Sequence, residues 1–303
     1  MLCVLVGYEA DMYRTLKEYL TEKYGCTVKK ICIDAGFSCP NRDGRAGHGG
    51  CIYCGERGAG EHIDPQASIT EQVELGLSRG GADAYIAYFQ SFTNTYADTA
   101  TLKERYDAAL IDERIRILSI GTRPDCLDDE VCRLIASYKD RLDVWVELGL
   151  QTANDRTAEV INRGYPLSTY REAAARLNSY GIPHITHIII GLPGENESDV
   201  LATVDEVNAS GAIGIKIHSI YVMEGTRLAE MYRENLYTPP TLDEYTHLAA
   251  KALARLSPDI VVHRITGDAP KDLLVAPEWN RDKSRVIREV REKYSLLVDS
   301  PSE

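Results

Sequence analysis

Strand-like and helix-like segments alternate almost without interruption along this chain of 303 residues. Apolar, β-branched runs predict strands at 28–35, 84–90, 114–121, 142–151, 184–193 and 212–222. The stretches between them predict helices at 66–78, 101–112, 127–139, 168–180 and 196–210. Gly181 and Gly211 follow two of these helices, at the position where a left-handed residue commonly ends a helix. This order predicts an α/β fold of βαβ units, as an open doubly wound sheet or an incomplete barrel.

The two ends of the chain differ from this repeating middle. We expect an N-terminal helical segment at 1–27, a core domain at 28–240 and a C-terminal extension at 241–303 that packs on the core. The extension should contain a helix at 241–256, an extended piece at 261–267 and a basic helix at 281–294.

Several classes of protein are disfavoured by what the sequence lacks. No GxGxxG follows the first predicted strand and no GxxxxGK[ST] occurs, which argues against the usual dinucleotide and nucleoside triphosphate sites. No run approaches 18 apolar residues, and the N-terminus lacks the basic region and cleavage site of a signal peptide. We therefore expect a cytoplasmic protein with no membrane partner.

The net charge of −12 argues against a uniformly basic nucleic-acid binder, but the charge is unevenly distributed. Residues 13–57 carry eight Lys/Arg and five Asp/Glu, and residues 263–293 carry eight and six. These two mildly basic segments are compatible with a local phosphate-contacting face. Ordinary solvated helix faces would explain them equally well.

The most informative stretch for chemistry is the glycine-rich loop after the first predicted strand. It carries Cys39, Cys51 and Cys54 in the spacing C-x11-C-x2-C. Loops at the carboxyl ends of parallel strands build sites, and two cysteines separated by two residues can reach one metal centre from a tight turn. Glycines let the backbone wrap closely around a bulky group.

Three thiolates favour an iron–sulfur cluster over a structural zinc ion. Structural zinc is normally closed by four ligands, and electron-transfer [4Fe-4S] clusters normally have four cysteines. A three-cysteine cluster leaves one iron open to another ligand. Zinc remains the alternative because His48 would complete a Cys3His set, whereas Tyr53, directly before the last cysteine, favours the cluster. The other cysteines are expected to be small buried hydrophobic residues: Cys3, Cys26, Cys32, Cys126 and Cys132.

The loop resembles that of the radical S-adenosylmethionine (SAM) superfamily, in its elongator-catalytic-subunit-like branch. The first gap is longer than the usual C-x3-C-x2-C and is similar to that of YhcC/YtqA-type proteins. The similarity extends over nearly the whole chain in the blocks DAGFSCPNRDG (34–44), YFQSFTNTYA (88–97), IGTRPDCL (120–127), ELGLQT (147–152), INRGY (161–165), GLPGE (191–195) and HRITGDAPKDLL (263–274).

The resemblance implies a partial (β/α)6 barrel of the TIM type, with SAM across the carboxyl ends of the strands. It implies that Cys39, Cys51 and Cys54 bind a [4Fe-4S] cluster whose open iron binds SAM. The residues that it places near SAM are Gln90 and Ser91 after the second strand, Thr122, Arg123 and Asp125 after the third, Glu147 and Gln151 on the fourth, Arg163 beside the SAM carboxylate, and His187 and Gly191 on the fifth. The usual Gly-Gly-Glu is absent at Gln90 and Ser91.

Structural roles are the alternatives at these positions. Glu147 could pair with a neighbouring Lys or Arg, Arg163 could be a surface residue at a helix end, and His187 could satisfy a core hydrogen bond. Lys216 and His218 alternate onto one face of the sixth strand, where they could line a substrate cavity or serve the structure. We expect the segment around Met223 to be core packing.

The implied activity is reductive cleavage of SAM to a 5′-deoxyadenosyl radical, which then abstracts hydrogen from a substrate. Elongator-type relatives act on the wobble uridine of tRNA, so a tRNA uridine is the expected substrate, with a flavodoxin or ferredoxin as electron donor. A chain of this length leaves no room for the elongator acetyltransferase domain, so a different side-chain step is expected. A radical SAM enzyme acting on a small metabolite, or a non-catalytic zinc or iron–sulfur protein, are the alternatives. Candidate hydrogen donors are Tyr53, Tyr88, Tyr96, Tyr221 and the spare cysteines.

Overall fold

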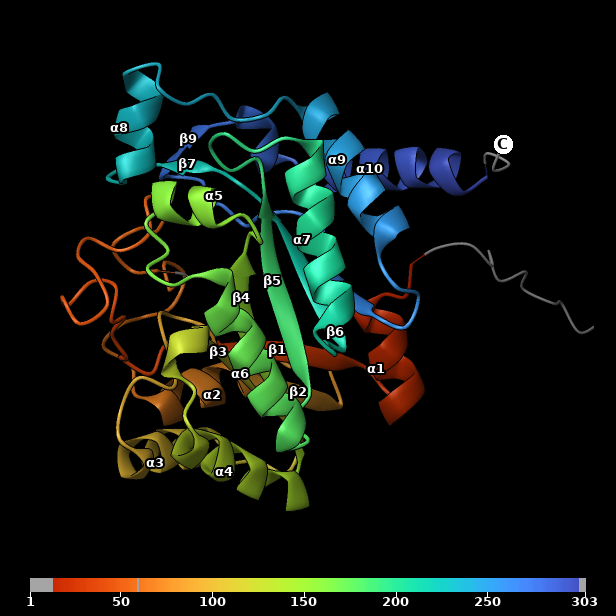
Figure 1. Cartoon of the computed structure of the whole chain (residues 1–303). Helices are drawn as coiled ribbons and strands as arrows, with labels where there is room; N and C mark the ends of the chain where they lie inside the picture. The colour runs from red at the N-terminus through yellow and green to blue at the C-terminus, as the bar shows by residue number, and fades with distance from the viewer. Residues whose placement is uncertain (1–12, 59, 300–303) are drawn as a thin grey trace, which may run out of the picture.

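A curled sheet of seven parallel strands forms the centre of the molecule (Figure 1). The computed structural model describes residues 13–58 and 60–299, so the prediction of an N-terminal helical segment and that for Cys3 fall partly or wholly outside the described residues. In sheet order the strands are β1 (Val28–Ile33), β2 (Ala84–Phe89), β3 (Ile115–Thr122), β4 (Asp143–Gln151), β5 (His184–Ile190), β6 (Gly214–Ser219) and β8 (Val261–Arg264).

This sheet confirms the predicted partial barrel. All six predicted strands are present, and each pairs in parallel with the next along the chain. The extended piece predicted in the C-terminal extension supplies β8, which pairs with β6 as a seventh strand of the same sheet. An antiparallel pair, β7 (Val222–Met223) and β9 (Leu274–Ala276), lies beyond the carboxyl end of β6.

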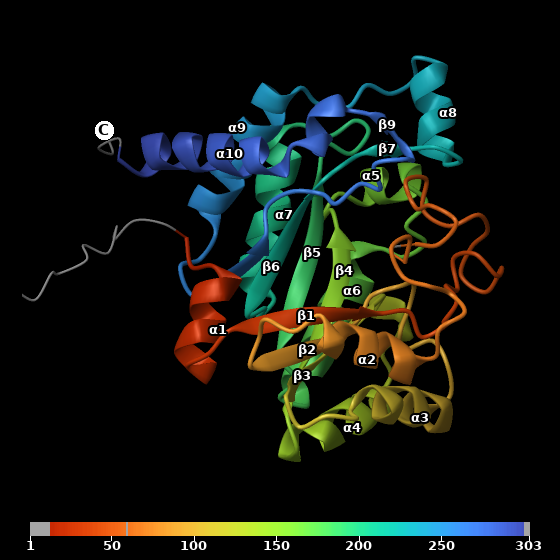
Figure 2. The same cartoon turned by 180° about the vertical axis from the view of Figure 1, so that it is seen from behind.

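Helices cover the outer face of the sheet (Figures 1 and 2). Those that were predicted are α2 (Ile69–Ser78), α3 (Thr99–Ala109), α4 (Asp129–Ser137), α6 (Leu167–Ser179), α7 (Glu197–Ala209), α9 (Leu242–Arg255) and α10 (Lys283–Val298). Helix α1 (Leu16–Tyr24) lies within the predicted N-terminal segment, and the short helices α5 (Asp155–Val160) and α8 (Arg227–Arg233) were not predicted. Gly181 and Gly211 have the expected positive φ, at 60° and 78°.

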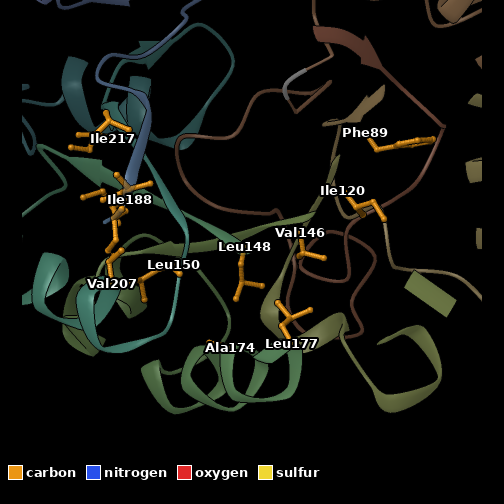
Figure 3. Close-up of a cluster of buried hydrophobic side chains, with 14 of the residues drawn as sticks. Phe89, Ile120, Val146, Leu148, Leu150, Ala174, Leu177, Ile188, Val207 and Ile217 are labelled. Atoms are coloured by element: carbon orange, nitrogen blue, oxygen red, sulfur yellow. The ribbon is translucent and has the colours of Figure 1, made fainter. Parts of the chain in front are cut away.

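The main hydrophobic core lies between the sheet and the outer helices. Strand side chains alternate, so Val146, Leu148 and Leu150 of β4 face outward (Figure 3). They pack with α6 residues such as Ala174 and Leu177, all buried. The residues between them therefore point into the barrel, including Trp145, Glu147 and Gly149.

An apolar floor closes the inside of the barrel at the amino ends of the strands. Helix α1 contacts both edge strands, β1 and β8, and Val262 donates its backbone N–H to Arg14 at 2.8 Å. Its buried Leu20 packs with the inward side chains Ile86, Ile117, Trp145 and Ile185. The barrel is consequently open only toward the carboxyl ends and along the gap between its edge strands. None of the helices in the described part of the chain is long and apolar enough to cross a membrane.

Candidate active site

The three cysteines of the glycine-rich loop line one cavity of about 270 Å³ at the carboxyl ends of the strands. Cys54 donates its backbone N–H to the Cys51 carbonyl at 2.9 Å, which closes the tight turn that the two-residue spacing predicts. Gly55 follows this turn, and a Cβ there would lie 2.0 Å from Cε of Met223, so the end of the Met223 side chain would have to move. The three cysteines therefore line the same cavity, and their joint binding of one cluster stays a prediction.

Two asparagines attach this loop to the barrel. Asn41 Nδ2 donates to the Asn162 carbonyl at 2.5 Å and lies 3.8 Å from Cys51 Sγ. Asn162, with a φ of 53°, donates in return to the Gly50 carbonyl at 2.7 Å. Sequence reasoning did not assign either residue, although Asn162 belongs to the INRGY block.

The chemistry of three thiols fits an iron–sulfur cluster, although burial disfavours their thiolate forms in the protein alone. Burial raises the pKa of the Cys54 thiol to about 11 and also raises the pKa of Cys51. Such thiols are poor anions by themselves, so a positively charged cluster is what would stabilise their thiolates. Arg42 supports the turn by donating to the Cys54 carbonyl at 3.0 Å.

The zinc alternative depended on His48, which does not join the cysteines. Its side chain is exposed and lies against Gly44, where a Cβ would be 2.7 Å from the imidazole Cε1. His48 is absent from the cavity lining, which contains the three cysteines. The site thus offers three thiols and an open side, as a [4Fe-4S] cluster with one free iron requires.

Most of the residues predicted near SAM line the same cavity. These are Gln90, Thr122, Arg123, Glu147, Gln151, Arg163 and His187. Ser91, Asp125 and Gly191 do not. Ser91 is fully buried, Asp125 accepts two hydrogen bonds from Arg123 at 2.9 and 2.7 Å, and the Gly191 carbonyl accepts one from the Tyr237 hydroxyl at 2.7 Å. Of these three residues, Asp125 contacts the cavity lining, since it binds the guanidinium of Arg123.

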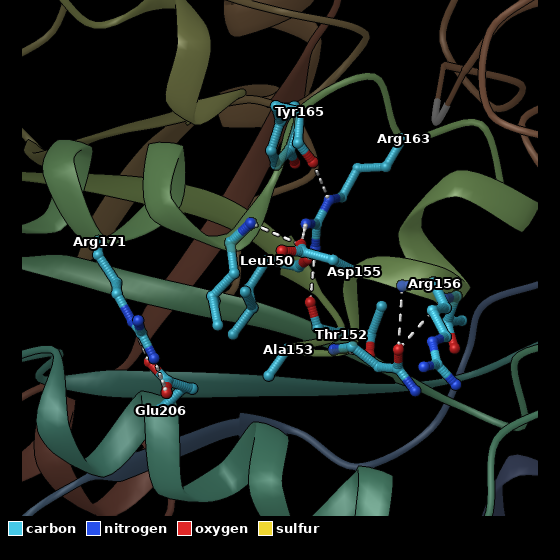
Figure 4. Close-up of polar contacts among 12 residues, drawn as sticks. Leu150, Thr152, Ala153, Asp155, Arg156, Arg163, Tyr165, Arg171 and Glu206 are labelled. Carbon is cyan, nitrogen blue, oxygen red and sulfur yellow. Dashed lines mark hydrogen bonds and ion pairs between the residues drawn. The ribbon is translucent and has the colours of Figure 1, made fainter.

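Arg163 is fixed by the chain itself (Figure 4). It is 1% exposed, so it is not the surface residue considered as an alternative. Its Nη1 donates to the carbonyls of Leu150 and Thr152 at 2.6 and 2.5 Å, and its Nε to that of Tyr165 at 3.0 Å. Nη2 lies 3.3 Å from Asp155. These contacts use four of the five N–H groups of the guanidinium, so the second N–H of Nη2 is the one left for the SAM carboxylate that the resemblance implies.

Glu147 lies deeper in the barrel. It forms an ion pair, as the alternative of a structural role predicted. Its carboxylate accepts from Ser119 Oγ at 3.0 Å and from His187 Nε2 at 2.7 Å, and it forms an ion pair with Lys216. Burial alone would raise its pKa, but the ammonium groups of Lys216 and Lys30 hold the pKa of Glu147 well below its ordinary value. His187 is partly buried, and desolvation inside the barrel lowers its pKa to about 4, which favours the neutral imidazole.

The structure also sorts the candidate hydrogen donors. Tyr53, Tyr88 and Tyr221 line the cavity, and Tyr96 does not.

Cys32 is not the buried hydrophobic residue that was predicted. It points into the barrel and lines an adjoining cavity, because alternation on β1 places Ile31 and Ile33 against α2 instead. Cys132 is buried as predicted, and Cys26 and Cys126 are partly exposed. Met223 is buried, and it lines the cavity.

Comparison with known proteins matches this architecture to one superfamily. The radical SAM superfamily model matches residues 42–207, and the model of the radical SAM C-terminal domain matches residues 212–295. Uncharacterized protein YtqA of Bacillus subtilis is 38% identical over 91% of this chain and 87% of its own length. Protein YhcC of Escherichia coli is 37% identical over 86% of this chain and 85% of its own.

More distant matches include tRNA-modifying proteins. The tRNA uridine(34) acetyltransferase of Dehalococcoides mccartyi is 32% identical over 60% of this chain, which spans only 40% of that protein. Among solved structures, the archaeal Elp3 of Methanocaldococcus infernus superposes with a TM-score of 0.65 at 18% identity, over 88% of this chain and 63% of that one. At that identity the superposition shows a shared fold. The superfamily match across more than half of the chain and the relatives in Bacillus and Escherichia establish that this protein belongs to the radical SAM superfamily.

Proposed function

We propose that this radical SAM enzyme modifies the side chain of the wobble uridine of a tRNA. Cys39, Cys51 and Cys54 would hold the [4Fe-4S] cluster, which, when bound, supplies the electron for reductive cleavage of SAM. Gln90, Thr122 and Gln151 line the mouth of the cavity and offer polar groups to SAM.

Apolar side chains at the same site would exclude water from the reaction. Phe92, Ile189 and Met223 line the cavity beside the thiols, together with the partly buried Tyr53 and the buried Tyr165. Removing water and competing hydrogen donors is what the protein must contribute when a cofactor supplies the reactive chemistry.

The observation that supports tRNA as the substrate is the 32% identity to the tRNA uridine(34) acetyltransferase of Dehalococcoides mccartyi. Since this chain spans 40% of that protein, only the nature of the substrate is carried over, and the acetyl-transfer reaction is not. Exposed basic residues are found on segments around the mouth, with Arg45 in the cysteine loop and Lys271 next to β9. They are available to contact phosphates.

Nucleoside analysis of tRNA from a strain lacking the gene tests this proposal. We expect a precursor to accumulate at the wobble position and its level to return to normal when the wild-type gene, but not its Cys54→Ala variant, is restored. An unchanged nucleoside profile would reject tRNA uridine in favour of a small metabolite. We also propose a cytoplasmic location and a flavodoxin or ferredoxin as the reductant.

A further inference from the structure

The inside of the barrel carries a layer of charged and polar side chains between the apolar floor and the cysteine site. We call it the charged belt, and it consists of Lys30, Tyr88, Ser119, Glu147, His187, Lys216, His218 and Arg264. The interior of a parallel barrel is normally filled by branched apolar residues, as the floor of this one is. The belt therefore calls for a reason other than packing.

The belt contains more positive than negative charge. Glu147 is its one carboxylate among the described residues, and Lys216 already pairs with it. Lys30 Nζ lies 3.8 Å from the same carboxylate and 5.1 Å from the Tyr88 ring centroid. Arg264 pairs in register with Lys216 on the neighbouring strand, and its nearest carboxylate, Asp268, is 3.8 Å away and also pairs with Lys283. Like charges on adjacent strands are destabilising unless an anion lies between them.

The belt faces open space, so an anion could reach it. Tyr88, Glu147 and His187 line the cavity that contains the three thiols. Lys30 and Arg264 line a second cavity of about 480 Å³ near β1 and β8, together with Lys29 and Arg79 and with the carboxylates of Glu61, Asp64 and Asp268, so four cationic side chains face three carboxylates there. His218 lines both cavities, and its buried Nε2 has no hydrogen-bond partner. A polar atom buried without a partner is costly, so His218 Nε2 is available to a polar group that enters either cavity.

We propose that the charged belt is an oxyanion-binding subsite, in which Lys30, Arg264 and His218 bind a carboxylate or phosphate group of the substrate. Glu147 would be a positioning residue that holds Lys216 and His187 in place. The subsite would fix the anionic end of the substrate deep in the barrel and its reacting carbon toward the thiol-lined cavity. This subsite rests on the proposed function in one respect, which is that the substrate binds inside the barrel. It would serve a modified uridine and a small metabolite alike.

Isothermal titration calorimetry of the reconstituted enzyme at constant ionic strength tests the subsite without RNA. Inorganic phosphate is the probe in one arm and acetate in the other, and the tighter binder identifies the oxyanion as a phosphate or a carboxylate. Loss of one charge-assisted hydrogen bond weakens binding about tenfold or more. We therefore expect Lys30→Gln and Arg264→Gln each to raise the Kd of the tighter-binding anion by about tenfold or more. Both side chains are partly exposed, so these variants should fold.

Two further variants complete the test. Lys30→Arg should retain binding, and Lys103→Gln, on the exposed surface of α3, should bind as the wild type does. Absence of saturable binding of both anions, or unchanged affinity in Lys30→Gln and Arg264→Gln, would overturn the subsite. Since no tRNA is present, such a result is separate from the nucleoside profile that tests the proposed function.

Discussion

Glu147 shows how much the inside of this barrel depends on a single side chain. Its fully buried carboxylate contacts Lys216, His187, Ser119 and Lys30. A buried charge is tolerated only when its partners are present, so removing one member leaves the others unpaired in a poorly solvated place.

We therefore expect Glu147→Gln to lower the free energy of unfolding by about 3 kcal/mol or more. The matched control is Asp205→Asn, which breaks the exposed ion pair with Arg255 and should cost less than about 1 kcal/mol. Urea denaturation under anaerobic conditions measures both. Equal losses in the two variants would contradict the importance of the buried network.

Glu195 gives a pH-dependent prediction. Burial raises its pKa to about 7 from an ordinary 4.5, against the lowering effect of the Thr152 hydroxyl that donates to it. Between pH 4.5 and 7 the folded state binds more protons than the unfolded state, so this group costs stability increasingly as the pH rises.

Below about pH 4.5, Glu195→Gln should therefore have the same free energy of unfolding as the wild type. Above pH 7 its free energy of unfolding should be larger by about 3 kcal/mol, at 1.36 kcal/mol per pKa unit. Denaturation curves at pH 5 and pH 8 check the sign. Glu172→Gln, exposed on α6, is the control that should show little change across this range. A difference that shrinks as the pH rises would refute the argument.

At the scale of single residues, the sequence identified groups but not their partners. Cys39, Cys51 and Cys54 could be assigned because their spacing describes a local turn and loop. The charge excess of the belt could not, since Lys30, Glu147 and Arg264 come from strands far apart in sequence. Arg163 was expected to bind a SAM carboxylate, which stays a prediction, and the sequence does not reveal that three backbone carbonyls accept hydrogen bonds from its guanidinium.

Among the structural elements, α1 has the most testable role. Its one buried side chain, Leu20, meets the floor residues of the barrel, including Trp145. Leu20→Ala should lower the free energy of unfolding by about 2–4 kcal/mol, because it removes buried methyl groups and leaves a cavity.

The control for this variant is Leu236→Ala, since Leu236 is 65% exposed, and it should change stability by no more than about 0.5 kcal/mol. Loosening of the floor should also alter the fluorescence of the buried Trp145. A Leu20→Ala protein as stable as the wild type would show that α1 does not close the barrel.

The long elements were predictable because their patterns extend over many residues. The β4 segment was expected at 142–151 and is found at Asp143–Gln151. Helices α5 and α8 have six and seven residues, too few to display a helical period. The segment of β8 was expected to be extended, but its place beside β6 is set by tertiary pairing that no local pattern records.

At the scale of the whole molecule, three layers follow one another along the inside of the barrel. The apolar floor closes the amino ends of the strands, the charged belt is proposed to bind a substrate oxyanion, and the cysteine loop follows the carboxyl end of β1 (Figure 2). Sequence resemblance anticipated the barrel and the loop, whereas the belt became visible only in three dimensions.

The central claim is that three thiols hold a cluster with one iron open to SAM. Its most direct test is anaerobic reconstitution followed by metal and sulfide analysis and a measurement of 5′-deoxyadenosine formed from SAM under reducing conditions. The account predicts iron and sulfide in the amounts of one [4Fe-4S] cluster per chain and formation of 5′-deoxyadenosine, lost in Cys54→Ala. Stoichiometric zinc, without 5′-deoxyadenosine, would contradict it.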